Sequence, residues 1–275
     1  RQGADAHVKT LLEFINPIVV GRNPLDIGAI WAEMWKQNRS VTTYAMGAVD
    51  VALWDIAGKV AGLPIHRLLG TCRDRIPAYS STAWQPTPEA YAEEALQFQS
   101  MGWTAYKIHP HGQAKPDIQI SRAVREAVGD DMVLMLDPFG VYTLEQALWV
   151  GRELEKLGFY WLEHPMLETR MEAYRRLSAE TRIAILAPEH VPGGVYAKAE
   201  WLLQRASNML RIDYYQGGIT GCHKLVNIAD AYGVQCEMHG GGWASSQILG
   251  STNESTCEYY ERGLLPLDPD FIEKP

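Results

Sequence analysis

The chain has 275 residues, of which 47% are hydrophobic, so it can bury a substantial core. Its formal net charge of −8 and the lack of any cluster of Lys and Arg argue against a surface for nucleic acid or for an anionic membrane. We therefore expect a small-molecule partner, with no nucleic acid and no membrane involved.

The cysteines and the terminal residues bear on the cellular compartment. Cys72, Cys222, Cys236 and Cys257 are scattered without a Cys-x-x-Cys pair, which indicates free thiols in a reducing environment. No stretch approaches the roughly 18 consecutive apolar residues of a membrane span, and the first ten residues, RQGADAHVKT, lack the layout of a signal peptide. We expect a cytoplasmic protein, and the start without Met indicates a truncated or interrupted chain.

The first part of the chain, residues 1–72, reads as helical. Apolar residues at helical spacing predict helices over 6–18, 24–37 and 42–61. The last of these has small residues that allow close packing, and it stops at Gly62-Leu63-Pro64. This segment is expected to form a helical subdomain.

From Ile76 onward, strand patterns alternate with helix patterns. The expected strands are 76–82, 104–109, 132–137, 159–163, 183–188, 209–213, 234–239 and, less regular in pattern, 256–261. The expected helices are 88–101, 117–128, 144–157, 171–179, 195–206 and 219–232. Such units imply parallel pairing, because each crossover returns the chain to the start of the next strand. Residues 73–265 are therefore predicted to form a TIM-type barrel with catalytic groups at the carboxyl ends of its strands, and 266–275 to begin a C-terminal segment.

Three acids close successive expected strands. Asp137, Glu163 and Glu189 follow one another at equal intervals of 26 residues. Carboxylates that converge in a partly buried site must be neutralised, and three hard oxygen ligands suit Mg²⁺. The alternative is that these acids are barrel-rim residues paired with Lys or Arg. The equal spacing favours a metal site.

Two further polar residues end the next strands. Asp213 closes MLRID and His239 closes VQCEMH, so adjacent strands would bring the two side chains within hydrogen-bonding reach. A carboxylate behind an imidazole fixes its tautomer and raises its basicity, which makes the outer nitrogen a general base. A structural histidine capped by an acid is the alternative. Beside a carboxylate site, we favour catalysis.

Lys107 and His109 end the second expected strand as Lys-Ile-His, so alternation turns both side chains to the same face. Lys107 could neutralise a bound carboxylate or a developing oxyanion, or could form a salt bridge to a neighbouring acid, and these roles are compatible. His109 could act in catalysis or could fill space as a hydrogen-bonding partner.

Taken together, several motifs resemble the mandelate racemase branch of the enolase superfamily, and more narrowly its acid-sugar dehydratases. The matching segments are AMGAVDVALWDIAGKVAGLP, YKIHP, LMLDPFG, YWLEHP, APEH, RIDYYQGGIT, CEMHGGG and CEYYERG. The resemblance implies a (β/α)7β barrel with a capping domain, of which residues 1–72 would be the helical part. It also implies that family members begin with a three-stranded sheet and end with a tail that completes the lid, neither of which is evident here.

The resemblance further implies roles for these residues. Mg²⁺ held by Asp137, Glu163 and Glu189 would bind the substrate carboxylate, and His239 oriented by Asp213 would take the α-proton to give an enediolate stabilised by the metal. Lys107 matches the first Lys of the family's Lys-x-Lys pair. Glu258 best matches the acid that hydrogen-bonds the substrate carboxylate, with Glu261 as the alternative if the register of the last strand differs by three. Relatives are commonly oligomeric, so a homo-oligomer is expected.

The chain departs from the family pattern at two positions. His109 stands where the racemases have a second Lys, and Phe139 stands where Asn often follows the first metal ligand by two residues. Racemisation needs two bases on opposite faces of the substrate, whereas dehydration needs one base and one acid. Either His239 itself or His109 could protonate the departing β-hydroxyl. The expected function is dehydration of a sugar acid, an aldonate or aldarate. The alternatives are a racemase or epimerase of a 2-hydroxy acid and an inactive relative that binds a carboxylate.

Overall fold

The computed structural model describes residues 4–38 and 40–263. Within these residues the chain forms two compact units that alternate along the sequence. The first unit comprises the described parts of Arg1–Ile76, Glu189–Leu203 and Leu210–Glu258. The second comprises the described parts of Pro77–Pro188, Gln204–Met209 and Tyr259–Pro275. The domain boundaries expected from the sequence stay predictions, and the expected segment 266–275 lies outside the described residues.

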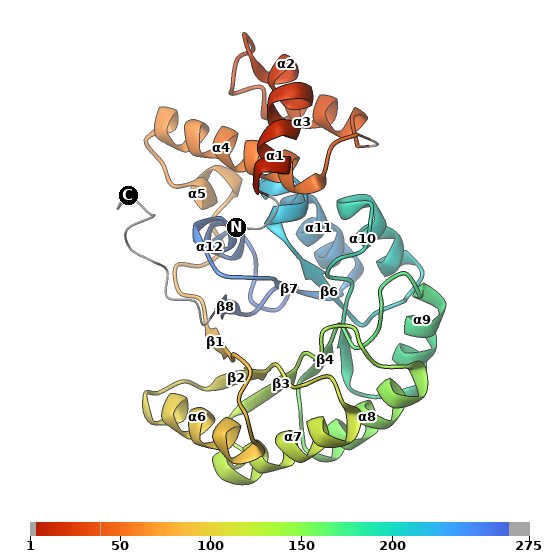
Figure 1. The fold of residues 1–275 in the computed structure, drawn as a ribbon. Helices are drawn as coiled ribbons and strands as arrows, with labels where there is room; N and C mark the ends of the chain where they lie inside the picture. The colour runs from red at the N-terminus through yellow and green to blue at the C-terminus, as the bar shows by residue number, and fades with distance from the viewer. Residues whose placement is uncertain (1–3, 39, 264–275) are drawn as a thin grey trace. The chain divides into compact units, whose positions relative to one another are not determined.

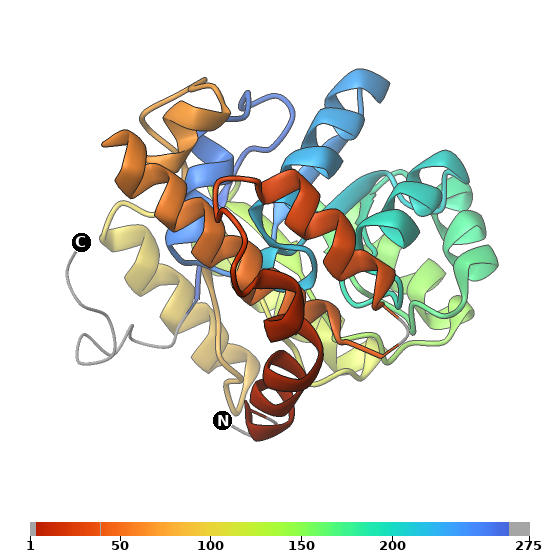
Figure 2. The same cartoon turned by 90° about the horizontal axis from the view of Figure 1, so that it is seen from above.

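The described residues before Ile76 are helical. They form α1 (Ala4–Thr10), a π-helical turn (Leu11–Ile15), α2 (Asn16–Val19), α3 (Ile27–Lys36), α4 (Thr43–Ala61) and α5 (Ile65–Leu69). Figure 2 looks onto these helices, coloured red to orange. The Thr42 side chain caps the start of α4, and Gly62 ends the helix in the left-handed conformation, at φ 64°.

Eight parallel strands follow in a single sheet, ordered β7-β6-β5-β4-β3-β2-β1-β8. Their bounds are β1 Ala78–Ser81, β2 Ala105–Ile108, β3 Val133–Leu136, β4 Trp161–Glu163, β5 Ala184–Leu186, β6 Met209–Ile212, β7 Gln235–Met238 and β8 Tyr260–Arg262. β1 pairs with β8, and Cys236 of β7 bridges Cys257, which lies shortly before β8. This sequential order is that of a TIM-type barrel, so the expected fold class is confirmed.

A helix joins each strand to the next. These are α6 Pro88–Ser100, α7 Ala114–Val128, α8 Leu144–Lys156, α9 Met171–Glu180, α10 Gly194–Leu203, α11 Gly218–Tyr232 and α12 Trp243–Gly250, with a 3₁₀ turn, η2, at Tyr214–Gln216. In Figure 1, α6, α7 and α8 lie side by side along one side of strands β1 to β4. Helices α5 and α12 were not expected from the sequence.

The interior of the second unit contains a cluster of large side chains. Its members are almost fully buried, and they come from β1 to β6 and from the residue just before β8: Tyr79, Ala105, Met135, Trp161, Leu186, Met209 and Tyr259. Tyr79 packs edge-on against Trp161, with ring centroids 5.6 Å apart. Because this packed layer fills the inside of the sheet, polar side chains are left to the strand ends.

The structure also shows the state of the cysteines and the character of the helices. All four cysteines are free thiols, and three of them, Cys222, Cys236 and Cys257, are buried. No helix in the described residues has both the length and the apolar character needed to cross a bilayer.

Candidate functional site

Asp137 and Glu163 occupy equivalent places on neighbouring strands of the second unit. Leu136 of β3 pairs with Leu162 of β4, so the acids that follow these residues come at the same level of the sheet. Both carboxylates are buried. The next pairing along the sheet, Glu163 with Leu186, leads to the chain segment that carries Glu189 three residues later. Three candidate acids thus follow three successive strands at their carboxyl ends.

Lys107 lies among the carboxylates of the second unit. Its Nζ is 3.0 Å from Glu163 Oε2, 2.8 Å from Glu261 Oε1 and 3.8 Å from Asp137 Oδ2. The lysine is only 1% exposed. The Trp161 indole also donates a hydrogen bond to Glu163 Oε2, at 3.2 Å. The three carboxylates stabilise the buried ammonium of Lys107, and the ammonium in turn holds them in fixed positions.

His109 is held from both of its ring nitrogens. Nδ1 lies 2.7 Å from the Thr82 carbonyl oxygen, and Nε2 lies 3.2 Å from Asp137 Oδ2. A carbonyl and a carboxylate oxygen accept hydrogen bonds, so His109 can donate an N–H to Thr82 from Nδ1 or to Asp137 from Nε2.

In the first unit, His239 lies between two carboxylates. Its Nδ1 is 3.2 Å from Asp213 Oδ2, and its Nε2 is 3.1 Å from Glu189 Oε1. The backbone N–H of Tyr215 donates to Asp213 Oδ1 at 2.7 Å, which fixes that carboxylate from its other side. His190 Nε2 also contacts Glu189 Oε1, at 2.8 Å. The sequence-predicted pair Asp213 and His239 is thus brought together, with Glu189 facing the outer nitrogen.

The last strand begins later than the sequence suggested. The expected strand 256–261 is observed as β8 at Tyr260–Arg262, so Glu258 precedes the strand, and its backbone N–H donates to Glu237 Oε1 at 3.1 Å. Glu261 lies on β8 opposite Tyr79 of β1, and its carboxylate contacts Lys107. The placement of Glu258 within the last strand was wrong because pairing with β1, a remote segment, sets the register of β8.

Two residues near Glu189 and Asp213 were missed by the sequence analysis. The Gln216 side chain donates to the Glu189 carbonyl oxygen at 2.7 Å and so fixes the backbone that carries this acid. At the start of α4, the pKa of the Tyr44 phenol is raised, first by its burial and then by the negative charges of Asp213 and Glu189. A tyrosine at the start of an expected helix carried no signal of this placement, because the contact depends on residues about 150 positions away.

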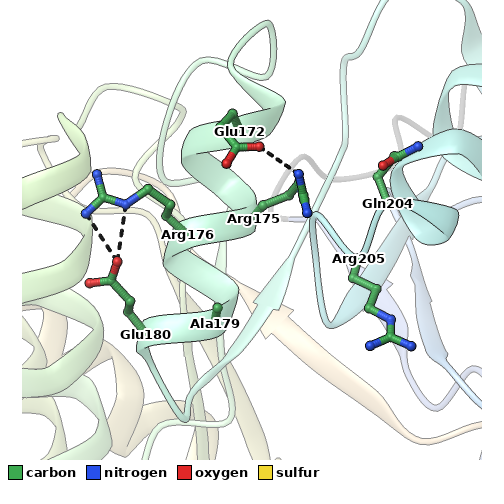
Figure 3. A pocket seen from close by; sticks show the side chains of 7 residues that line it. All are labelled: Glu172, Arg175, Arg176, Ala179, Glu180, Gln204 and Arg205. Carbon is green, nitrogen blue, oxygen red and sulfur yellow. Dashed lines mark hydrogen bonds and ion pairs between the residues drawn. The ribbon is translucent and has the colours of Figure 1, made fainter.

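A separate surface hollow on α9 differs from these carboxyl-end groups. In Figure 3, Arg175 points toward Glu172 and Arg176 toward Glu180, at 2.9 Å and 3.2 Å. The hollow is lined by Glu172, Arg175, Arg176, Ala179, Glu180, Gln204 and Arg205. These residues lie in and after helices that lead into the amino ends of β5 and β6. Exposed, mutually paired charges at that end have little catalytic potential.

Known families match most of the chain. The sequence profile described as enolase C-terminal domain-like matches residues 90–275. The profile of the mandelate racemase / muconate lactonizing enzyme N-terminal domain matches residues 2–70. The second match covers the helical segment, and the first covers the strands and helices that carry the acids described above.

Two curated relatives are named as dehydratases. An arabinonate dehydratase of Saccharolobus solfataricus is 30% identical over 249 residues, which are 86% of this chain and 66% of that protein. A D-gluconate dehydratase of Thermoproteus tenax is 28% identical, over 80% of this chain and 48% of that protein. The chain thus spans between about half and two thirds of the length of these curated relatives.

One solved structure with a similar fold is also named as a dehydratase. The D-glucarate dehydratase from Agrobacterium tumefaciens complexed with magnesium superposes with a TM-score of 0.90 and 34% sequence identity. The superposition covers 96% of this chain and 73% of that chain.

Proposed function

This chain belongs to the enolase C-terminal domain-like family, and from that membership we propose that the full-length protein is a Mg²⁺-dependent dehydratase of a sugar acid, an aldonate or aldarate. Relatives named as arabinonate and D-gluconate dehydratases support the substrate class. The proposal assigns the reaction to groups at the carboxyl ends of the strands, and a homo-oligomer is expected for the whole protein.

Asp137, Glu163 and Glu189 would hold the metal ion. The donor set fits Mg²⁺, because all three residues offer hard carboxylate oxygens and are buried. When bound, Mg²⁺ would fix the substrate carboxylate and acidify the neighbouring C–H group. It would also engage Glu189, whose Oε1 lies 3.1 Å from His239 Nε2 here. The remaining chemistry belongs to side chains of this chain.

His239 is the proposed base. Asp213 accepts the hydrogen bond from Nδ1, which leaves the Nε2 lone pair to take the α-proton of the substrate. The pairing also stabilises the imidazolium that forms, because the carboxylate lies 3.2 Å from the protonated ring.

His109 is the proposed acid. As the β-carbon–oxygen bond breaks, the departing hydroxyl takes the proton from His109 and leaves as water, while the electron pair of the former C–H bond forms the new double bond. The contacts of His109 with Thr82 and Asp137 support this role because both partners accept an N–H from the ring and hold it in place. Lys107 would stabilise negative charge that develops on the substrate carboxylate. Its partner Glu261, rather than Glu258, would be the acid that hydrogen-bonds that carboxylate.

The observation that carries the proposal is the Asp213–His239 hydrogen bond at the ends of β6 and β7. The test is a screen of aldonates and aldarates with the full-length protein, in Mg²⁺ and in chelator. His239→Asn should reduce dehydration by about 10³-fold or more while Mg²⁺ binding, measured by calorimetry, persists. His223→Asn in α11 is the matched control and should keep turnover.

Three outcomes would contradict the proposal. Full turnover in His239→Asn would remove the assigned base. Exchange of the α-hydrogen with solvent deuterium without loss of water would indicate a racemase or epimerase. Binding of many acid sugars without turnover of any would indicate an inactive carboxylate-binding relative.

A further inference from the structure

Three aromatic rings form a row in the second unit, beside the candidate acids. The Phe139 ring is stacked on His109, with centroids 4.7 Å apart and planes inclined by 19°. Trp84 meets Phe139 edge-on, with centroids 6.1 Å apart and an angle of 88°. Phe139, His109 and Trp84 follow β3, β2 and β1, so rings from the carboxyl ends of three neighbouring strands meet here, with Phe139 between the other two.

The backbone of Phe139 is held in an unfavourable conformation. Its φ is 60°, in the left-handed region that bulky residues rarely adopt. The Phe139 N–H donates to Asp137 Oδ1 at 3.0 Å, which ties this turn to a candidate metal ligand. Strain of this kind persists where surrounding contacts fix it, often at ligand sites. The turn holds the Phe139 ring over His109.

Two of the three rings are open to solvent. Trp84 is 67% exposed and Phe139 is 47% exposed, whereas the other large aromatic side chains of this unit's interior are buried. Trp84 therefore does not serve core packing. Two large exposed aromatic faces beside buried acids indicate a ligand-binding surface, because small-molecule sites combine aromatic side chains with a few placed polar groups.

We propose that Trp84 and Phe139 form an aromatic platform that binds the C–H face of the substrate's carbon chain beyond its β-carbon. The identity of the occupant rests on the proposed function. His109 is assigned to the β-hydroxyl, so the rings that continue outward from His109 meet the carbons farther from the carboxylate. The C–H face of an extended sugar acid is weakly positive and apolar, which complements the negative face of an aromatic ring. The platform selects acids of five or six carbons over short 2-hydroxy acids.

The test compares two substitutions on acids of different length. Phe139→Asn removes the ring but keeps the turn, because Asn tolerates the left-handed conformation. Trp84→Ala removes the outer ring. Each should raise KM for six-carbon D-gluconate about fivefold to tenfold, with kcat nearly unchanged, and should leave KM for three-carbon glycerate unchanged. Trp149→Ala in α8 removes another exposed tryptophan, 39% exposed, and is the matched control.

A binding measurement separates this inference from the proposed reaction. D-gluconate added with Mg²⁺ should quench tryptophan fluorescence, and Trp84→Phe should remove most of that quenching. Quenching through Trp84 without turnover would support the platform while the proposed dehydration fails. Turnover with KM values unaffected by Phe139→Asn and Trp84→Ala, or equal losses for D-gluconate and glycerate, would overturn the platform while the reaction stands.

Discussion

Asp50 of α4 and Thr220 of α11 are joined by two hydrogen bonds although 170 residues separate them. Asp50 Oδ2 accepts from the Thr220 backbone N–H at 2.8 Å, and Asp50 Oδ1 accepts from the Thr220 hydroxyl at 2.6 Å. The same hydroxyl accepts from the Trp54 indole at 2.9 Å. Trp31 of α3 adds a bond to the Gly217 carbonyl oxygen at 3.0 Å. Helices from the start of the chain thereby fix the turn that follows Asp213.

The pH dependence of stability should report on Asp50. Burial raises the pKa of this carboxyl from 3.8 to about 6. The folded protein thus keeps a proton that the unfolded chain releases, so the contribution is fully present below about pH 4 and is lost as pH rises to about 6. The difference amounts to about 3 kcal/mol of unfolding free energy. Urea unfolding from pH 4 to pH 7 should show this loss, and Asp50→Asn should reduce the slope in that window. An unchanged slope in Asp50→Asn would contradict the assignment.

Two glycines at opposite ends of α11 allow the contact with Asp50 to be measured. Gly218 and Gly233 have nearly the same positive φ, 68° and 65°. A Cβ at Gly218 would overlap the Asp50 carboxylate, whereas one at Gly233 would meet nothing within 4 Å. Gly233→Ala should therefore cost about 1 kcal/mol from the backbone alone, and Gly218→Ala about 2 kcal/mol or more beyond that. Equal thermal shifts for the two variants would show that the tight packing is absent.

The strands and their terminal acids could be predicted because both are local signals. An apolar run that ends in Asp, Glu or His marks a parallel strand and its functional end within a few residues, which is how Asp137 and His239 were found. Helix α12 was missed because three glycines precede it and its own residues lack a charged face. The register of β8 and the bonds of Asp50 depend on segments far away in the sequence. The left-handed turn at Phe139 had no signal in the sequence, because a bulky residue such as Phe rarely adopts a positive φ.

Asp213 should control the tautomer of His239 and therefore the rate of proton abstraction. Asp213→Asn keeps the size of the side chain but presents an amide that can donate to Nδ1, which would move the ring proton to Nε2, the proposed basic atom. We expect kcat to fall by about 10²- to 10⁴-fold with little change in KM. Steady-state kinetics on the best sugar acid would check this, with Asp230→Asn in α11 as the control. A rise in KM with kcat unchanged would indicate instead that Asp213 contacts the substrate.

Lys107 should stabilise the protein chiefly when no divalent cation is present. Lys107→Met leaves the carboxylates of Asp137, Glu163 and Glu261 close together without their shared ammonium, and breaking a buried pair costs about 3–5 kcal/mol. Mg²⁺ would stabilise both folded proteins, by about 2.7 kcal/mol at a concentration 100 times its Kd. It would bind more tightly to Lys107→Met, where no ammonium competes for the carboxylates, and so recover part of this loss. Thermal unfolding in chelator and in Mg²⁺ should therefore show a large destabilisation in the first and a smaller one in the second. Lys156→Met, which removes an exposed ion pair with Glu153, should change stability little in both conditions. Equal destabilisation of Lys107→Met with and without Mg²⁺ would count against a cation at these acids.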